Sequence, residues 1–171
     1  MKRPFGSRSS AGLKSVGFAG AFLFLGLQVA PVPAPRTNPP VNLKLTIHSD
    51  PAVPAAVQDV LERSCMNCHS NATQWPWYSR VAPASWLVAY DVTKARKALN
   101  FSEWGALKPP VRVALAAAMC ENVRTGRMPL PRYLVMHPGA RLDQADKDVL
   151  CIWSQEVLQS LARPKSLRRS E

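Results

Sequence analysis

Residues 65–69 of the chain read Cys65-Met66-Asn67-Cys68-His69. This Cys-x-x-Cys-His pattern is the attachment motif of a covalently bound haem. Two thiols three positions apart lie on one side of a helical turn, where each can add to a haem vinyl group. The imidazole that follows then reaches the iron. We therefore expect Cys65 and Cys68 to hold one haem c, with His69 as the proximal iron ligand.

A Cys-x-x-Cys pair also occurs in thioredoxin-like redox sites and in zinc sites. A thioredoxin-like site needs the pair at a strand-to-helix junction of a βαβ unit, and the sequence predicts no such unit. A zinc site needs further ligands at metal spacing, whereas Cys120 and Cys151 each stand alone. In an oxidising compartment these two could form a disulfide or remain buried thiols. We expect the disulfide, because free thiols would compete during haem attachment.

Large aromatic side chains follow the attachment motif. They are Trp75, Trp77, Tyr78 and Trp86. We expect them to bind the cofactor by packing their rings against the porphyrin and keeping water from the iron. Plain core packing is the alternative for any single one of them.

The whole stretch from residue 65 to residue 79 reads CMNCHSNATQWPWYS. It resembles the signature CHSN-x-T-x-WPWYS of a bacterial family of membrane-anchored haem-binding-domain proteins. The resemblance continues at residues 82–87, 99–104, 126–129 and 137–142, and it extends in outline over residues 28–155. It implies an exported, membrane-anchored haem c-binding domain, and it implies no established substrate.

The sequence offers more than one candidate for the second axial ligand of the iron. Met128 follows the helix stop at Gly126 and precedes Pro129, so it lies in a stiff loop between the attachment motif and a C-terminal helix. We expect Met128 to ligate the iron, with His137 as the alternative. His–Met ligation suits one-electron transfer without substrate chemistry. An open distal site would instead suit a haem-based sensor or a peroxidase-like protein, and a purely structural haem is a third possibility.

Apolar spacing predicts four helices and no strand. One begins at Asp50-Pro51 and runs into Cys65, and the others cover residues 84–99, 109–126 and 143–161. The period of these stretches is helical throughout. We therefore expect an all-α fold, a small cytochrome c-like helical domain around one haem, preceded by an N-terminal membrane-anchor helix.

The N-terminus predicts the compartment. Five of the 22 Lys/Arg residues and no acidic residue lie within residues 1–36, and residues 16–32 are apolar apart from Gln28 and several glycines. This pattern predicts a single pass through the cytoplasmic membrane, with the soluble domain on the periplasmic side. A cleaved signal peptide is the alternative, because Ala30 and Ala34 are small enough for a cleavage site.

Four segments follow from these patterns. They are a basic N-terminus and signal anchor (1–36), a Pro-rich linker (37–52), a haem c-binding domain (53–162) and a basic tail (163–171). The net charge of +11 is unevenly placed, and the moderate net charge of +6 over residues 37–171 (17 Lys/Arg, 11 Asp/Glu) fits an acidic redox protein, such as a respiratory-chain component, or an anionic membrane surface. Basic residues do not cluster into a stripe before the tail, so we expect no nucleic-acid binding.

Overall fold

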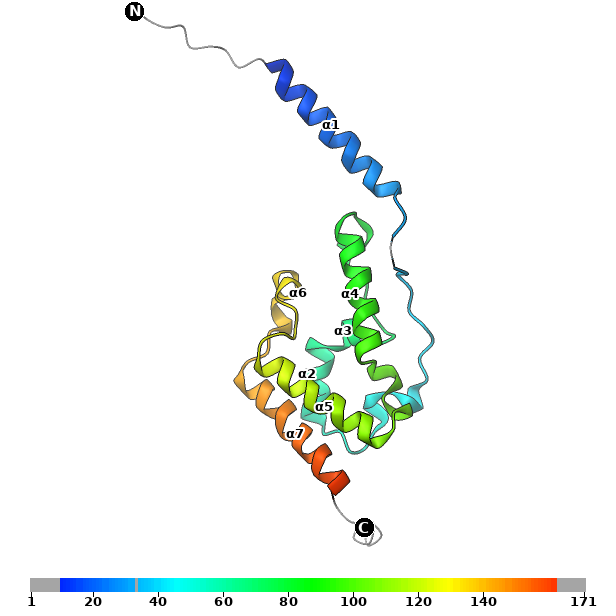
Figure 1. The fold of residues 1–171 in the computed structure, drawn as a ribbon, viewed down its shortest axis with the longest axis vertical. Coiled ribbons are helices and arrows are strands. Elements are labelled where there is room, and N and C mark those ends of the chain that lie inside the picture. The colour runs from blue at the N-terminus through cyan, green and yellow to red at the C-terminus, as the bar shows by residue number, and fades with distance from the viewer. Residues whose placement is uncertain (1–9, 33, 163–171) are drawn as a thin grey trace, which may run out of the picture. The chain divides into compact units, whose positions relative to one another are not determined.

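The computed structural model describes residues 10–32 and 34–162. Within these residues the chain forms seven α-helices and five short 3₁₀ helices, with no strand (Figure 1). The expected all-α fold is therefore confirmed. The basic residues Lys2, Arg3 and Arg8 and the basic tail at 163–171 lie outside the described residues.

The helices of the sequence prediction form with small shifts at their ends. The α-helices are α1 Ser10–Val29, α2 Ala55–Ser64, α3 Met66–His69, α4 Ala84–Ala98, α5 Pro109–Arg124, α6 Pro131–Met136 and α7 Gln144–Ala162. The 3₁₀ helices are η1 Leu43–Leu45, η2 Ile47–Ser49, η3 Trp77–Arg80, η4 Phe101–Ala106 and η5 Pro138–Ala140. The first predicted helix starts at Ala55 instead of Pro51, because Asp50 forms a turn in which its carbonyl and carboxylate accept the N–H groups of Val53 and Ala52.

The chain divides into two compact units. The larger unit comprises residues 37–74 and 91–162 of the described chain, and the smaller unit comprises residues 10–36, without 33, and 75–90. In the larger unit, α5 packs along α7 (Figure 1). The two helices are joined by the expected disulfide, Cys120–Cys151, with a Cα–Cα distance of 4.8 Å.

The core of the larger unit collects apolar side chains from nearly all of its helices. Its most deeply buried members are Ile47, Val57, Leu61, Phe101, Trp104, Val123, Leu150 and Trp153. Ile47 belongs to the segment expected to be a Pro-rich linker, yet its side chain is completely buried. Gly105 of η4 also approaches Leu45 of η1 so closely that a Cβ atom would lie 3.0 Å from the Leu45 Cα. Residues 43–50 are therefore part of the domain.

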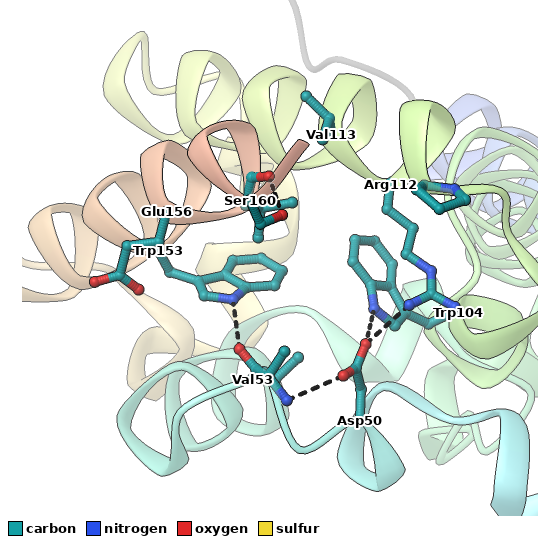
Figure 2. Close-up of a pocket in the computed structure, with 11 residues that line it drawn as sticks. Asp50, Val53, Trp104, Arg112, Val113, Trp153, Glu156 and Ser160 are labelled. Atoms are coloured by element: carbon teal, nitrogen blue, oxygen red, sulfur yellow. Dashed lines mark hydrogen bonds and ion pairs between the residues drawn. The ribbon is translucent and has the colours of Figure 1, made fainter. Parts of the chain in front are cut away.

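Asp50 connects three parts of this core. Its Oδ2 atom accepts hydrogen bonds from Trp104 Nε1 and from Arg112 Nη1, each at 3.1 Å (Figure 2). The Arg112 guanidinium lies 5.9 Å from the centre of the Trp104 ring and also donates to the carbonyls of Gly105 and Leu107. Hydrogen-bonded charges of this kind are costly to break one partner at a time. Asp50 therefore fixes η4 and the start of α5 against η2.

In the smaller unit, Gln28 of α1 and Arg36 further along the chain bind backbone groups of residues 79–82. Gln28 Oε1 accepts from the Ala82 N–H at 3.0 Å, Gln28 Nε2 donates to the Ala82 carbonyl at 3.3 Å, and Arg36 donates to the Ser79 carbonyl. The apolar N-terminal segment thus forms a helix, as expected. Among the described residues, however, no helix combines the length and apolar character needed to cross a membrane, in contrast to the expected membrane-anchor helix.

Candidate cofactor site

The Cys-x-x-Cys-His motif forms a single helical turn in the larger unit. α2 ends at Ser64, and the chain then turns at Cys65, which has φ −127° and ψ −40°. The N–H groups of Cys68 and His69 both donate to the Cys65 carbonyl, at 3.1 and 3.0 Å. Both cysteines are free, half-buried thiols. The motif residues are therefore brought together as the sequence predicts.

The imidazole of His69 is held by the chain directly after helix α4. Its Nδ1 atom lies 2.9 Å from the carbonyl oxygen of Leu99. Because a carbonyl oxygen only accepts, Nδ1 carries the proton and Nε2 keeps its lone pair. Burial lowers the pKa of His69, which favours the neutral ring. A neutral imidazole fixed through one nitrogen is the usual arrangement of a metal-ligating histidine.

The two thiols differ from those of a redox-active Cys-x-x-Cys pair. Burial raises the pKa of Cys65 to about 12, and burial together with the charge of Asp91 raises that of Cys68 to about 11. Redox-active pairs have lowered pKa values, so these values disfavour the thioredoxin-like alternative. The described residues also contain no group of three or more His, Cys, Asp or Glu side chains that could hold a metal ion, which gives no support to a zinc site.

The loop after His69 is fixed by side chains that are distant in the sequence. Asn71 donates its N–H to Ser102 Oγ at 2.9 Å, and its Oδ1 atom accepts from Asn100 Nδ2 at 2.9 Å. The Nδ2 atom of Asn71 donates to the Pro40 carbonyl at 3.2 Å. The attachment turn is therefore anchored directly to η4, which also carries Phe101, whose ring lies 6.1 Å from that of His69.

Arg96 of α4 is the most connected side chain near the attachment turn. Its Nε donates to the Ser70 carbonyl at 2.7 Å, and Nη1 donates to the Thr37 carbonyl at 2.8 Å. Its Nη2 donates to Asn38 Oδ1 and to Thr73 Oγ1, each at 2.8 Å. In the sequence, Arg96 is one of several basic residues on one face of a helix, and no local pattern distinguishes it from its neighbours.

The loop that carries Met128 is well defined. Gly126, with φ +69°, ends α5 in a left-handed conformation, and the Arg127 N–H donates back to the Asn122 carbonyl at 2.9 Å. Together with the bond from Gly126 N–H to the Val123 carbonyl at 3.3 Å, this is a Schellman motif. Met128 is half-buried and packs against the core of the larger unit. It thus belongs to the same unit as His69 and remains the predicted distal ligand.

Helix α6, which follows the Met128 loop, contacts both the attachment turn and α4. Asn67, inside the motif, hydrogen-bonds through its side chain with Tyr133 of α6, and its Oδ1 accepts from the Gln74 N–H at 2.7 Å. Arg132 forms a bidentate pair with Asp91 of α4, at 2.9 and 2.6 Å. These contacts hold α6 against the motif.

His137, the alternative distal ligand, ends α6. Its ring stacks on that of Tyr133, with the centroids 4.1 Å apart and an interplanar angle of 17°. This stacking gives the His137 ring a packing role within α6. The structure therefore offers an explanation of His137 that needs no iron.

The four aromatic residues expected around the porphyrin belong to the smaller unit. Trp77 is 73% exposed and meets the Tyr78 ring edge-on at 5.8 Å. The Nε1 atom of Trp86 is buried and has no hydrogen-bond acceptor among the described residues. The predicted role of Trp75, Trp77, Tyr78 and Trp86 in haem binding stays a prediction.

Each unit also contains a cavity. In the larger unit a cavity of about 300 Å³ lies beside Trp104 and Trp153, and no predicted haem ligand lines it (Figure 2). In the smaller unit a cavity of about 840 Å³ is lined by Trp75 together with Arg36 and Arg80. The residues predicted to attach the haem therefore do not line this cavity beside Trp104 and Trp153.

Comparison with protein families identifies the chain. The model of the haem-binding domain family matches residues 22–156, so the chain belongs to this family. The match includes the attachment turn, α4 to α6 and the loop with Met128. Comparisons with curated proteins and with solved structures gave no match. The donor set fits the group that the family binds, because two free thiols and a neutral, oriented imidazole lie on one helical turn.

Proposed function

We propose that the chain is a c-type cytochrome that holds one haem covalently and transfers single electrons on the outer side of the cytoplasmic membrane. The observation that carries the proposal is the attachment turn. It combines the free thiols of Cys65 and Cys68 with a His69 ring whose Nδ1 is held by the Leu99 carbonyl. Membership of the haem-binding domain family supports the choice of cofactor.

Each residue of the turn has a defined part in this proposal. The thiols of Cys65 and Cys68 would hold the haem as thioethers, each S–H adding across a vinyl C=C bond, so that no oxidant would be needed. His69 would bind the iron through Nε2, and Met128 would supply its thioether as the second ligand. When bound, the haem supplies one-electron exchange between the ferric and ferrous states. A closed iron favours electron transfer over reaction with small ligands.

The distribution of charged residues and the disulfide support the proposed compartment and redox partner. The basic N-terminus before an apolar segment supports export of the domain, and the Cys120–Cys151 disulfide suits an oxidising compartment. Residues 37–171 carry 17 Lys/Arg and 11 Asp/Glu, a net charge of +6, which supports an acidic redox protein as the electron partner. Fusing a reporter that is active only outside the cytoplasm to the C-terminus tests export, and an inactive reporter would contradict it.

A visible spectrum of the purified protein tests the central proposal. We expect haem bands in both redox states, haem staining that survives denaturing electrophoresis, and no change when carbon monoxide is added to the reduced protein. The Cys65→Ala/Cys68→Ala double variant should lose the stain, whereas Cys120→Ala/Cys151→Ala should keep it. Staining that survives in the first variant would refute covalent attachment. A wild-type protein that binds carbon monoxide readily would favour the sensor or peroxidase-like alternative.

A further inference from the structure

The positive charge of Arg96 has no counter-ion among the residues that hold it. Its four hydrogen bonds go to two backbone carbonyls, one amide oxygen and one hydroxyl, all of them neutral acceptors. The ion pairs within the described part of the chain do not include Arg96. The side chain is half-buried, so solvent screens its charge only in part.

This charge lies beside the attachment turn. Arg96 binds the carbonyl of Ser70, the residue directly after His69, at 2.7 Å. Leu99, three residues after Arg96, accepts the hydrogen bond from His69 Nδ1 with its carbonyl oxygen. Residues 96–99, at the C-terminal end of α4 and just after it, therefore orient the proximal imidazole and bring a fixed positive charge to the same turn.

We propose that Arg96 both positions the attachment turn and raises the reduction potential of the haem. The inference rests on the proposed function. The ferric site carries one more positive charge than the ferrous site, so a nearby fixed positive charge favours the ferrous state. Removing the charge should therefore lower the potential. A merely structural Arg96 would affect folding and haem attachment, and the potential would not follow its charge.

Three variants separate charge from structure. Arg96→Gln removes the charge, whereas Arg96→Lys keeps the charge but cannot span the same acceptors. Asn38→Asp keeps the Arg96 side chain and sets a carboxylate where Asn38 Oδ1 already accepts from Nη2 at 2.8 Å, with loss of the bond that Asn38 Nδ2 donates to the Thr73 carbonyl at 2.8 Å. The matched control is Lys97→Gln, which removes one charge from an exposed position of the same helix.

The experiment is a potentiometric titration of the full-length, haem-loaded protein. For both Arg96→Gln and Asn38→Asp we expect the ferrous-to-ferric ratio at a fixed potential to fall about tenfold, which is about 59 mV for one electron. Arg96→Lys should stay near the wild-type potential but melt at a lower temperature, and Lys97→Gln should change neither value.

Two results would overturn the inference. One is an unchanged potential in Asn38→Asp, which also decides the matter if Arg96→Gln fails to retain haem. The other is an equal fall in Arg96→Lys and Arg96→Gln, which would show that geometry and not charge sets the potential. Neither result bears on the proposed function, because that proposal is tested on the wild-type protein, by its covalent haem, its response to carbon monoxide and its export.

Discussion

Met128 is the residue on which the distal side of the iron depends. Its backbone N–H is held by the Asn122 carbonyl at 3.1 Å, and its side chain packs on the core of the larger unit. If its sulfur binds iron, Met128→Ala should open a coordination position while His69 and both thioethers stay in place. We expect the reduced variant to bind carbon monoxide and its potential to fall, because a thioether favours the ferrous state. Spectra with and without carbon monoxide measure both effects.

The control for this prediction is His137→Ala. The His137 ring stacks on Tyr133, so its removal should leave the spectrum nearly unchanged. A spectrum that responds to the His137 change and ignores the Met128 change would establish bis-histidine ligation instead.

We expect the loss of the Asp50 side chain to destabilise the larger unit strongly for the few atoms that are removed. Asp50→Ala leaves the buried Trp104 Nε1 and the Arg112 guanidinium without their shared acceptor. We expect the free energy of unfolding to fall by about 2–4 kcal/mol. Chemical denaturation followed by tryptophan fluorescence gives the value. Asp59→Ala, at an exposed position of α2, should change it by less than about 0.5 kcal/mol, and equal effects of the two variants would contradict the role of Asp50.

The same residues show how far single residues can be predicted from sequence. The chemistry of Cys65, Cys68 and His69 can be predicted from a local sequence motif, and the structure brings them together on one turn. Arg96 and Asp50 carry no such motif, because their partners lie far away in the chain. Arg96 and Thr37 are 59 residues apart, and Asp50 and Arg112 are 62 residues apart. Only the packing of the helices creates these contacts.

Helices with a long apolar face are the elements that the sequence predicts best. α2, α4, α5 and α7 all repeat apolar residues at helical spacing, and each forms close to its expected limits. α6 and the 3₁₀ helices were not expected, because elements of three to six residues are too short to show a period. α6 has no buried residue and is held by polar contacts, such as the pair between Arg132 and Asp91. Apolar patterns therefore could not reveal the element that follows Met128.

Helix α7 begins with a reciprocal cap that predicts acid sensitivity. Asp146 Oδ2 accepts from the Asp143 N–H at 3.1 Å, and Asp143 Oδ1 accepts from the Asp146 N–H at 2.8 Å. Arg63 of α2 pairs with Asp146 at 2.6 Å. Burial alone would raise the pKa of Asp146, but the bonds from Arg63 and Asp143 outweigh it and lower the pKa below the ordinary value of 3.8.

The sign of the pH dependence follows from that lowered pKa. A carboxyl group with a lower pKa in the folded state stabilises the fold above its unfolded pKa, and this contribution is lost as the pH falls through the folded pKa. Asp146→Asn should therefore cost about 0.5–1 kcal/mol at pH 7, and its difference from the wild type should shrink below pH 3.8. Denaturation at several pH values measures this. Glu156→Gln, an exposed change on the same helix, should show no such convergence, and a constant Asp146→Asn difference would contradict the prediction.

For the molecule as a whole, the question is whether the N-terminal segment stays with the mature protein. Gln28 is the polar interruption of an otherwise apolar run, and in the smaller unit it pairs with both backbone groups of Ala82. The family match begins at residue 22 and so includes Gln28. Cleavage after Ala30 or Ala34 would remove this side chain and leave the Ala82 N–H and carbonyl without it.

We therefore expect the exported protein to retain Gln28. The intact mass of the protein purified from expressing bacteria measures this directly, and a mature N-terminus at residue 31 or 35 would show that the segment is a cleaved signal. Gln28→Leu keeps the segment apolar but cannot pair with Ala82, so export should persist while residues 75–90 become more sensitive to proteolysis. Gln28→Glu keeps the acceptor for the Ala82 N–H and loses the donor to its carbonyl, so its sensitivity should lie between those of the wild type and Gln28→Leu. Equal resistance in all three proteins would mean that the segment is held by contacts other than those of Gln28.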